Sequence, residues 1–124
     1  MRLRPHHIAL IVSDLEASRS FYRALGFKAG DEMDVGTAII AFMHSGGLEL
    51  ELFCYRDTPP AVAEERVLGF RHLALTTRDV DRALAKLQAD GIVPHDVVVR
   101  DVGFARLAFF PDPDGAEIEI VEYT

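Results

Sequence analysis

Two stretches of the chain alternate apolar and acidic residues in the same way. Residues 47–53 read GLELELF, and residues 115–121 read GAEIEIV. Strict alternation of this kind predicts a half-buried strand with its apolar side chains on one face and its glutamates on the other. Because the pattern occurs twice, we expect the chain to contain two copies of one structural unit.

The segments that precede these strands support a duplication. Residues 6–27 align without gaps on residues 71–92, and the acidic strands align at nearly the same offset. The aligned pairs of chemically distinctive residues are His7 with His72, Asp14 with Asp79, Gly26 with Gly91, Glu49 with Glu117 and Glu51 with Glu119. Matches of histidine, aspartate, glycine and glutamate in one order indicate an internal repeat.

Each copy has the pattern of a strand followed by a helix. Residues 6–13 alternate like a strand, and Asp14 is a good N-cap for the helix that follows. Gly26 then stands where a left-handed helix C-cap is favoured. The buried helix stripes are expected at Leu15, Phe21, Tyr22 and Leu25 in the first copy, and at Val80, Leu84 and Leu87 in the second, between Asp79 and Gly91.

Further strands are expected after each helix. The pattern places them at about 37–43 and 48–54 in the first copy, and at about 95–100, 105–110 and 117–122 in the second. Residues 44–47 and 111–115 are rich in turn formers. Residues 55–69 carry two prolines and no strand pattern, which is typical of a connection between copies. One helix covers only one face of its sheet, so the other face is left as a cup for the second half or for another chain.

Alternation along the strands predicts which side chains enter the cup. Ile8, Leu10 and Val12 should pack under the helix, so His7 faces the cup, and the same logic applies to His72. The glutamates of both acidic strands, Glu49, Glu51, Glu117 and Glu119, share that face. Carboxylates that converge in a partly dry cup repel one another, and a divalent cation removes this cost. Mixed nitrogen and oxygen ligation suits Zn²⁺, Ni²⁺, Co²⁺, Mn²⁺ or Fe²⁺ better than Ca²⁺.

Composition narrows the class of partner. The chain has 124 residues, enough for one ordinary domain, and a formal charge of −7, which argues against nucleic acid as a partner. No apolar run approaches the roughly 20 residues that span a bilayer, so no membrane segment is expected. The basic and then apolar start lacks a cleavage site, and the single Cys54 suits a reducing compartment, so we expect a cytoplasmic protein.

Four motifs resemble the vicinal oxygen chelate superfamily, which includes glyoxalase I, bleomycin-resistance proteins and extradiol dioxygenases. They are HIALIVSDLEASRSFY (7–22), LELF (50–53), FRHLALTTRDV (70–80) and FFPDPDGAEIEIVE (109–122). The resemblance implies an α+β fold, in which two tandem βαβββ modules form a cup-shaped mixed sheet around a metal. It makes residues 1–124 a single domain with module one at 5–54, a linker at 55–69 and module two at 70–124.

The closest pattern is that of short glyoxalase I-like proteins. Their metal ligands come from the first and last strand of each module, which implies His7, Glu51, His72 and Glu119 as ligands here. The implied activity is that of a metal-dependent lyase or isomerase, similar to lactoylglutathione lyase. Its substrate would be a small molecule with vicinal oxygens, such as a thiol hemithioacetal of an α-ketoaldehyde, which reacts through a metal-stabilised enediolate. Glu119 or Glu51 would be the catalytic base.

Alternatives remain open on sequence alone. A ring-cleaving dioxygenase would use His7, His72 and Glu119, but Glu51 would fill the position that oxygen needs. A non-catalytic binding or resistance protein would not need four good ligands. Bacterial glyoxalase I holds glutathione with an arginine and an asparagine, whose positions are Ile11 and Tyr55 here, so glutathione specificity is not expected. Proteins of this size in the family are usually homodimers, and the two modules can either face each other within one chain or pair with the modules of a partner chain by swapping.

Several other residues are candidates for the surroundings of the site. Phe42, Phe53 and Phe110 are candidate apolar walls of the cup, although core packing is the favoured interpretation of each one. Arg106 is a candidate for meeting an anionic substrate, although an ordinary surface arginine is the favoured interpretation. Glu49 and Glu117 are expected near the ligands or on the solvated rim. No role is expected for His6, at the strand edge, or for His44 and His95, which the pattern places in turns.

Overall fold

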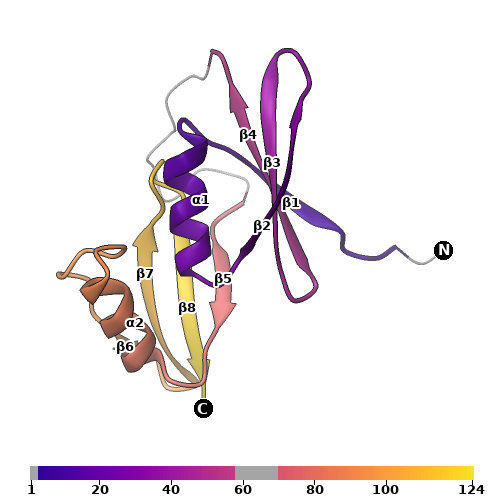
Figure 1. Ribbon diagram of the computed structural model, residues 1–124. Coiled ribbons are helices and arrows are strands. Elements are labelled where there is room, and N and C mark those ends of the chain that lie inside the picture. Colours follow the sequence, from indigo (N-terminus) through magenta and orange to yellow (C-terminus); the bar gives the residue numbers. More distant parts are fainter. Residues whose placement is uncertain (1–2, 58–69) are drawn as a thin grey trace. The chain divides into compact units, whose positions relative to one another are not determined.

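The computed structural model describes residues 3–57 and 70–124. Contacts divide the chain into two compact units, Met1–Pro60 and Ala61–Thr124, and each is described by itself below. Each unit holds one helix and one four-stranded mixed sheet, which confirms the α+β class and the βαβββ modules (Figure 1). The predicted connection at 55–69 lies mostly outside the described residues.

The first unit runs through five elements, β1 (His7–Ile11), α1 (Leu15–Ala24), β2 (Lys28–Asp34), β3 (Ala38–Ser45) and β4 (Leu48–Tyr55). Its sheet has the order β1-β4-β3-β2. The first and last strands of the module are therefore neighbours, and they run parallel, whereas the other pairs are antiparallel. This topology places the beginning of β1 beside the acidic strand β4.

The second unit repeats this plan with β5 (Leu73–Thr76), α2 (Val80–Ala89), β6 (Arg100–Asp101), β7 (Ala105–Pro111) and β8 (Glu117–Tyr123). Its sheet order is β5-β8-β7-β6, and β5 is parallel to β8. The equivalence is element by element, so the repeat seen in the sequence is a repeat of structure.

The helix ends match their sequence signals. The Asp14 side chain accepts a hydrogen bond from the Ala17 amide at 3.1 Å, and the Asp79 side chain accepts one from the Arg82 amide at 3.0 Å. Each carboxylate thereby satisfies one of the amides that the first helical turn leaves unpaired. Gly26 follows the first helix with a φ of 103°, a left-handed conformation that glycine adopts at little cost.

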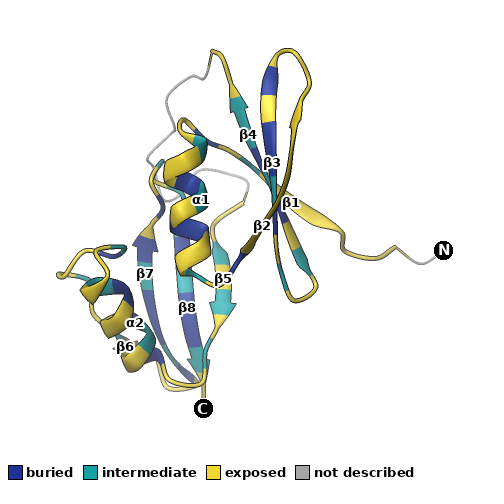
Figure 2. Cartoon of the chain, in the orientation of Figure 1, coloured by how far each residue is buried: buried dark blue, intermediate teal, exposed yellow. Residues whose placement is uncertain are grey.

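Most of the core of each unit lies between its helix and one face of its sheet, and in the second unit Ala105, Leu107 and Val121 form a further buried cluster on the other face, against which Phe109 packs. Buried positions alternate along β4 and β8, where Leu50 and Leu52, and likewise Ile118 and Ile120, turn inward (Figure 2). Tyr22 on α1 is fully buried as predicted. The helices therefore cover the apolar face of each sheet, and the glutamate face lies on the opposite side.

Several expectations about local structure were wrong. The strand β2 was not predicted, because its sequence KAGDEMD is polar and exposed throughout and carries no alternation. Of the strand expected at 95–100, only Arg100 pairs with β7, since residues 95–99 form turns and irregular structure and β6 covers only Arg100 and Asp101. His44 lies in β3 and not in a turn. Ile8, expected under the helix, is exposed on β1, which is an edge strand of the first sheet.

No helix in the described part of the chain is both long and apolar enough to cross a membrane.

Candidate metal centre

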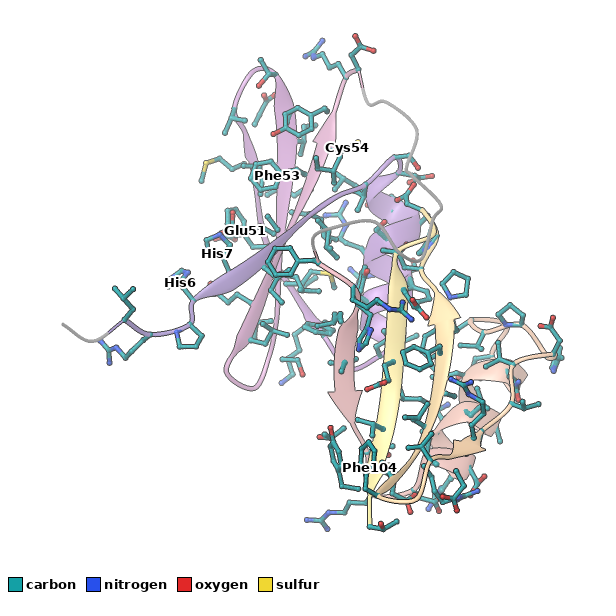
Figure 3. The ribbon with its side chains drawn as sticks, turned by 180° about the vertical axis from the view of Figure 1, so that it is seen from behind. His6, His7, Glu51, Phe53, Cys54 and Phe104 are labelled. Atoms are coloured by element: carbon teal, nitrogen blue, oxygen red, sulfur yellow. The ribbon has the colours of Figure 1, made fainter. Side chains whose placement is uncertain are left out.

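His7 and Glu51 meet on the glutamate face of the first sheet. In the parallel pair, His7 lies opposite Glu49, and Ala9 lies opposite Glu51. The imidazole therefore reaches diagonally across the pair, past the small side chain of Ala9, and its Nε2 lies 3.2 Å from Oε2 of Glu51. Figure 3 shows the two labelled side chains together on this face. The Glu51 side chain is 16% exposed and that of His7 is 38% exposed, so the pair is accessible to a small ligand.

His72 and Glu119 repeat this geometry in the second sheet. Ala74 lies opposite Glu119 in the parallel pair, and His72 precedes Ala74 by two residues. The distance from His72 Nε2 to Glu119 Oε2 is 3.9 Å, and the side chains are 26% and 12% exposed. Each unit thus brings one imidazole and one carboxylate together, and in both units the histidine lies two residues before the alanine that pairs with the glutamate.

The other two glutamates of the acidic strands have different neighbours. Glu49 is exposed and lies opposite His44 in the antiparallel pair of β3 and β4. Glu117 forms an ion pair with Arg71, which immediately precedes His72. Both lie beside the candidate ligand pairs, as expected for the rim.

The aromatic walls differ from the sequence expectation. Phe42 pairs with Glu51 and Phe53 lies on the same face, where its ring stacks on Tyr55 with a centroid distance of 6.0 Å. Phe110 is buried on the helix side of the second sheet, so it is core and not a wall. Its neighbour Phe109 pairs with Glu119 and makes an edge contact with the His72 ring at 5.2 Å.

Arg106 does not face the candidate site. Its guanidinium forms an ion pair with Asp81 on α2, so it lies on the helix side of the sheet. The hydrogen bond from Arg106 lowers the pKa of Asp81 below its ordinary value, and the same bond raises the pKa of Arg106. This pair joins helix to sheet, so the less favoured alternative for Arg106, contact with a substrate anion, is wrong.

His6 lies closer to the candidate site than its sequence position suggested. Its Nδ1 is 2.8 Å from Nδ1 of His7, so one ring donates a hydrogen bond to the other (Figure 3). If His7 is the donor, its Nε2 is the nitrogen with the free lone pair, which is the one facing Glu51. The two histidines are adjacent in the sequence, and this could have indicated that their rings are in contact.

Taken by itself, neither half of the described chain gathers three His, Cys, Asp or Glu side chains closely enough to hold a metal ion. Each half contributes one imidazole–carboxylate pair. Three residues near His72 on this face of the second sheet were not identified from the sequence, namely Phe109, Arg71 and Arg100. Alternation along residues 105–111 could have placed Phe109 on this face, and the arginine immediately before His72 could have indicated a basic neighbour.

The fold and this duplicated ligand face define a class of protein built from paired βαβββ modules. The family model described as the Glyoxalase/Bleomycin resistance protein/Dioxygenase superfamily matches residues 4–120. The chain therefore belongs to this superfamily, whose members include lyases such as lactoylglutathione lyase.

Individual relatives agree with this assignment. The chain is 34% identical to the uncharacterized protein YwkD of Bacillus subtilis, with 94% of each chain covered. It is similar to the crystal structure of a glyoxalase family protein from Enterococcus faecalis, with a TM-score of 0.83, 30% identity, and coverage of 96% of this chain and 97% of that one. It is 27% identical to a lactoylglutathione lyase of Pseudomonas putida, over 96% of this chain and 84% of the enzyme.

Proposed function

We propose that this protein is a metal-dependent lyase or isomerase of the glyoxalase I type. The observation that carries the proposal is the repeated contact of a histidine Nε2 with a glutamate Oε2 at duplicate positions, His7 with Glu51 and His72 with Glu119. The similarity to the Pseudomonas putida lactoylglutathione lyase supports the same reaction class. The proposed substrate is small and has two neighbouring oxygens, as in the hemithioacetal of an α-ketoaldehyde and a thiol.

The chemistry of the donor set fits one divalent cation. His7, Glu51, His72 and Glu119 would hold it, and two neutral imidazoles, two carboxylates and M²⁺ sum to zero charge. Mixed nitrogen and oxygen donors suit Ni²⁺, Zn²⁺, Co²⁺, Mn²⁺ or Fe²⁺. The carboxylates are the less exposed members of the two pairs, and partial burial of an uncompensated carboxylate is unfavourable. A bound cation would offset this cost.

The chain's own residues supply the proton transfer. When bound, the cation would act as a Lewis acid toward the two oxygens of the substrate. Glu119, the least exposed of the four ligand side chains, is our assignment for the base. Its carboxylate takes the proton from the carbon that bears sulfur and returns it to the neighbouring carbon. The hemithioacetal becomes a thioester of a 2-hydroxy acid, with no net gain or loss of protons or electrons.

Metal analysis tests the ligand set. Wild-type protein incubated with Ni²⁺ or Zn²⁺ and desalted is expected to retain a stoichiometric amount of metal. His72→Ala and Glu119→Ala should retain less than about a tenth of it, because loss of one ligand commonly costs well over tenfold in affinity. Glu122→Gln is the matched control, since Glu122 lies on the same strand but faces the helix, where it accepts from the Val80 amide at 2.8 Å. Background metal in the wild type would overturn the proposal.

Turnover tests the reaction and the thiol. Hemithioacetals of methylglyoxal with several thiols should be converted to thioesters only in the presence of metal. Glutathione is not expected to be preferred, because Ile11 and Tyr55, which stand where bacterial glyoxalase I has its glutathione-binding arginine and asparagine, offer neither a cation nor an amide. Absence of turnover with every thiol by a protein that does hold metal would exclude the lyase reaction while leaving the metal site.

A further inference from the structure

The ring of His7 is contacted at both of its nitrogens. Its Nδ1 lies 2.8 Å from Nδ1 of His6, and the two rings meet edge to face with their centroids 5.1 Å apart. Its Nε2 lies 3.2 Å from Oε2 of Glu51. Figure 3 shows the three labelled side chains next to one another along the beginning of β1. A ring that is held at two nitrogens has little freedom to rotate about its side-chain bonds.

This restraint is important because the His7 side chain is otherwise open to solvent. It is 38% exposed and belongs to β1, which is an edge strand of the first sheet. Within residues 3–57, the structure records no aromatic contact of the His7 ring except the one with His6. An exposed side chain loses rotamer freedom when it binds a ligand, and a side chain that is already held in one orientation loses less.

The second module holds its equivalent ring in a different way. Arg71 occupies the position that corresponds to His6, and it forms an ion pair with Glu117. The ring of His72 packs against the edge of the Phe109 ring, with the centroids 5.2 Å apart. The repeat therefore preserves the two proposed ligand histidines but not their support, which is a hydrogen bond in the first module and packing on the sheet in the second.

An imidazole is well suited to support another imidazole, because its Nδ1 either donates or accepts a hydrogen bond. A histidine that binds a metal through Nε2 carries its hydrogen on Nδ1, so His7 would then donate to His6. When the hydrogen of His7 is on Nε2, His7 accepts at Nδ1 and His6 donates. Each neutral ring carries one hydrogen in both arrangements, so the contact persists whether or not an ion is bound.

We propose that His6 is a positioning residue for the first ligand pair. It holds the His7 ring with Nε2 directed toward Glu51, and it accepts the hydrogen bond from Nδ1 in the tautomer that can bind a metal. This inference rests on the proposed function. It extends that function to a residue that acts only through His7 and for which the sequence predicts no role.

NMR of the metal-free protein tests the hydrogen bond directly. Long-range ¹H–¹⁵N spectra show which ring nitrogen of each histidine carries the hydrogen, and they are recorded at about pH 8.5, where imidazoles are generally neutral. One ring must donate and the other accept, so His6 and His7 should have opposite tautomers in the wild type. His6→Leu should leave His7 as a mixture of tautomers. The same tautomer in both rings of the wild type would overturn the inference.

The affinity for Zn²⁺, measured by competition with a coloured chelator, tests the positioning role. His6→Leu should weaken binding by about tenfold, the effect typical of losing a hydrogen-bond partner of a metal ligand. His6→Asn should retain most of the affinity, because its amide oxygen and nitrogen are as many bonds from Cβ as Nδ1 is. His95→Leu is the control, since it removes an exposed imidazole from a turn of the second unit and should change nothing.

Urea unfolding of the metal-free proteins separates positioning from stability. His6 is exposed, so all the variants should unfold at the wild-type urea concentration. Unchanged Zn²⁺ affinity in His6→Leu, or an equal loss in His6→Leu and His6→Asn, overturns the inference and leaves the proposed function intact. A wild type that binds no Zn²⁺ overturns the proposed function itself, so the two failures are distinguishable.

Discussion

Ser18 is a buried hydroxyl on α1. Its side chain is completely inaccessible, and its Oγ has no hydrogen-bond partner among the described residues. A buried polar group without a partner costs about 1–3 kcal/mol relative to the solvated group. The residue therefore weakens the helix–sheet packing of the first module at a single atom.

Replacement by alanine removes that cost. Ser18→Ala is expected to raise the free energy of unfolding by about 1 kcal/mol, from the lost desolvation penalty and the better helix propensity of alanine. Urea denaturation followed by circular dichroism measures the change. Ser20→Ala is the control on the exposed face of the same helix, where propensity alone gives about half as much. A destabilised Ser18→Ala would show that the hydroxyl does have a partner.

The Asp81–Arg106 pair predicts a pH-dependent contribution to stability. Because Arg106 lowers the pKa of Asp81 in the folded protein, the pair stabilises the fold above the unfolded-state pKa of about 3.9 and loses this effect as pH falls through the folded-state value. Asp81→Asn should therefore be less stable than wild type near neutral pH, and the two should converge as pH falls below the lowered folded-state pKa of Asp81. Arg106→Gln should give the same profile. If the difference in stability between wild type and Asp81→Asn did not change with pH, the ion pair would not be the source of that difference.

At the scale of elements, the turn between β7 and β8 fixes the position of Glu119. The buried Asp112 side chain accepts hydrogen bonds from the amides of Asp114 at 2.9 Å and Ala116 at 2.8 Å. Its own amide donates to the Ala116 carbonyl at 2.7 Å, and Gly115 has a φ of 89°. Since a slip of one residue would move every side chain of β8 to the other face, this turn decides which face Glu119 occupies.

Removal of the Asp112 carboxylate should destabilise the hairpin. Asp112→Ala leaves two turn amides without their acceptor, and we expect a loss of about 2 kcal/mol in the free energy of unfolding. Asp112→Asn keeps one acceptor oxygen and should recover most of the loss. Chemical denaturation of the three proteins measures both effects. Equal stability of the alanine and asparagine variants would show that the hydrogen bonds to Asp112 do not hold the turn.

The sequence predicted those elements whose signals are local. Both helices begin at the expected caps, and the acidic strands were found from alternation, because a strand with one buried face must alternate. The strand β2 could not be predicted, since its seven residues are all exposed and only hydrogen bonds to β3 make it a strand. The length of β6 was overestimated because three consecutive valines at 97–99 are typical of a strand, although these residues are not part of one.

The candidate site shows the same division. Alternation along single strands was enough to place His7 and Glu51 on one face. The diagonal contact between them depends on the parallel register of β1 and β4, which no local pattern encodes. Phe109 was missed in favour of Phe110 because the two adjacent phenylalanines differ only in which face each occupies, and that depends on the register of β7 with β8.

At the scale of the whole molecule, the proposed cation needs one ligand pair from each kind of module, from the same chain or from a partner chain. Each half alone offers one imidazole and one carboxylate, which are too few for tight binding, so occupancy needs residues of both modules. We propose that the protein acts as a homodimer, as its size and family suggest. Light scattering should then give twice the chain mass of 13.8 kDa, and a mass equal to that of one chain would contradict the proposal.

Metal should therefore stabilise the entire protein in a way that any single ligand substitution abolishes. At a free metal concentration one hundred times the dissociation constant, wild type should gain about 2.7 kcal/mol. Thermal unfolding with and without Ni²⁺ measures this as a shift of several degrees in Tm. His7→Ala and Glu119→Ala, which lie in different modules, should both lose the shift. Retention of the shift in either variant would show that one pair is sufficient for binding.

The same histidine–glutamate contact occurs in both sheets, which is the arrangement expected of a duplicated unit. A chain of half this length would carry a single histidine–glutamate contact, and two such chains associating about a two-fold axis would have reproduced the full donor set without any partner of different sequence. Two copies within one polypeptide, by contrast, need not be identical. Three carboxylates line the hollow beside Phe42, whereas two arginines lie over the ring of Phe109, so the two copies carry different charges at equivalent positions.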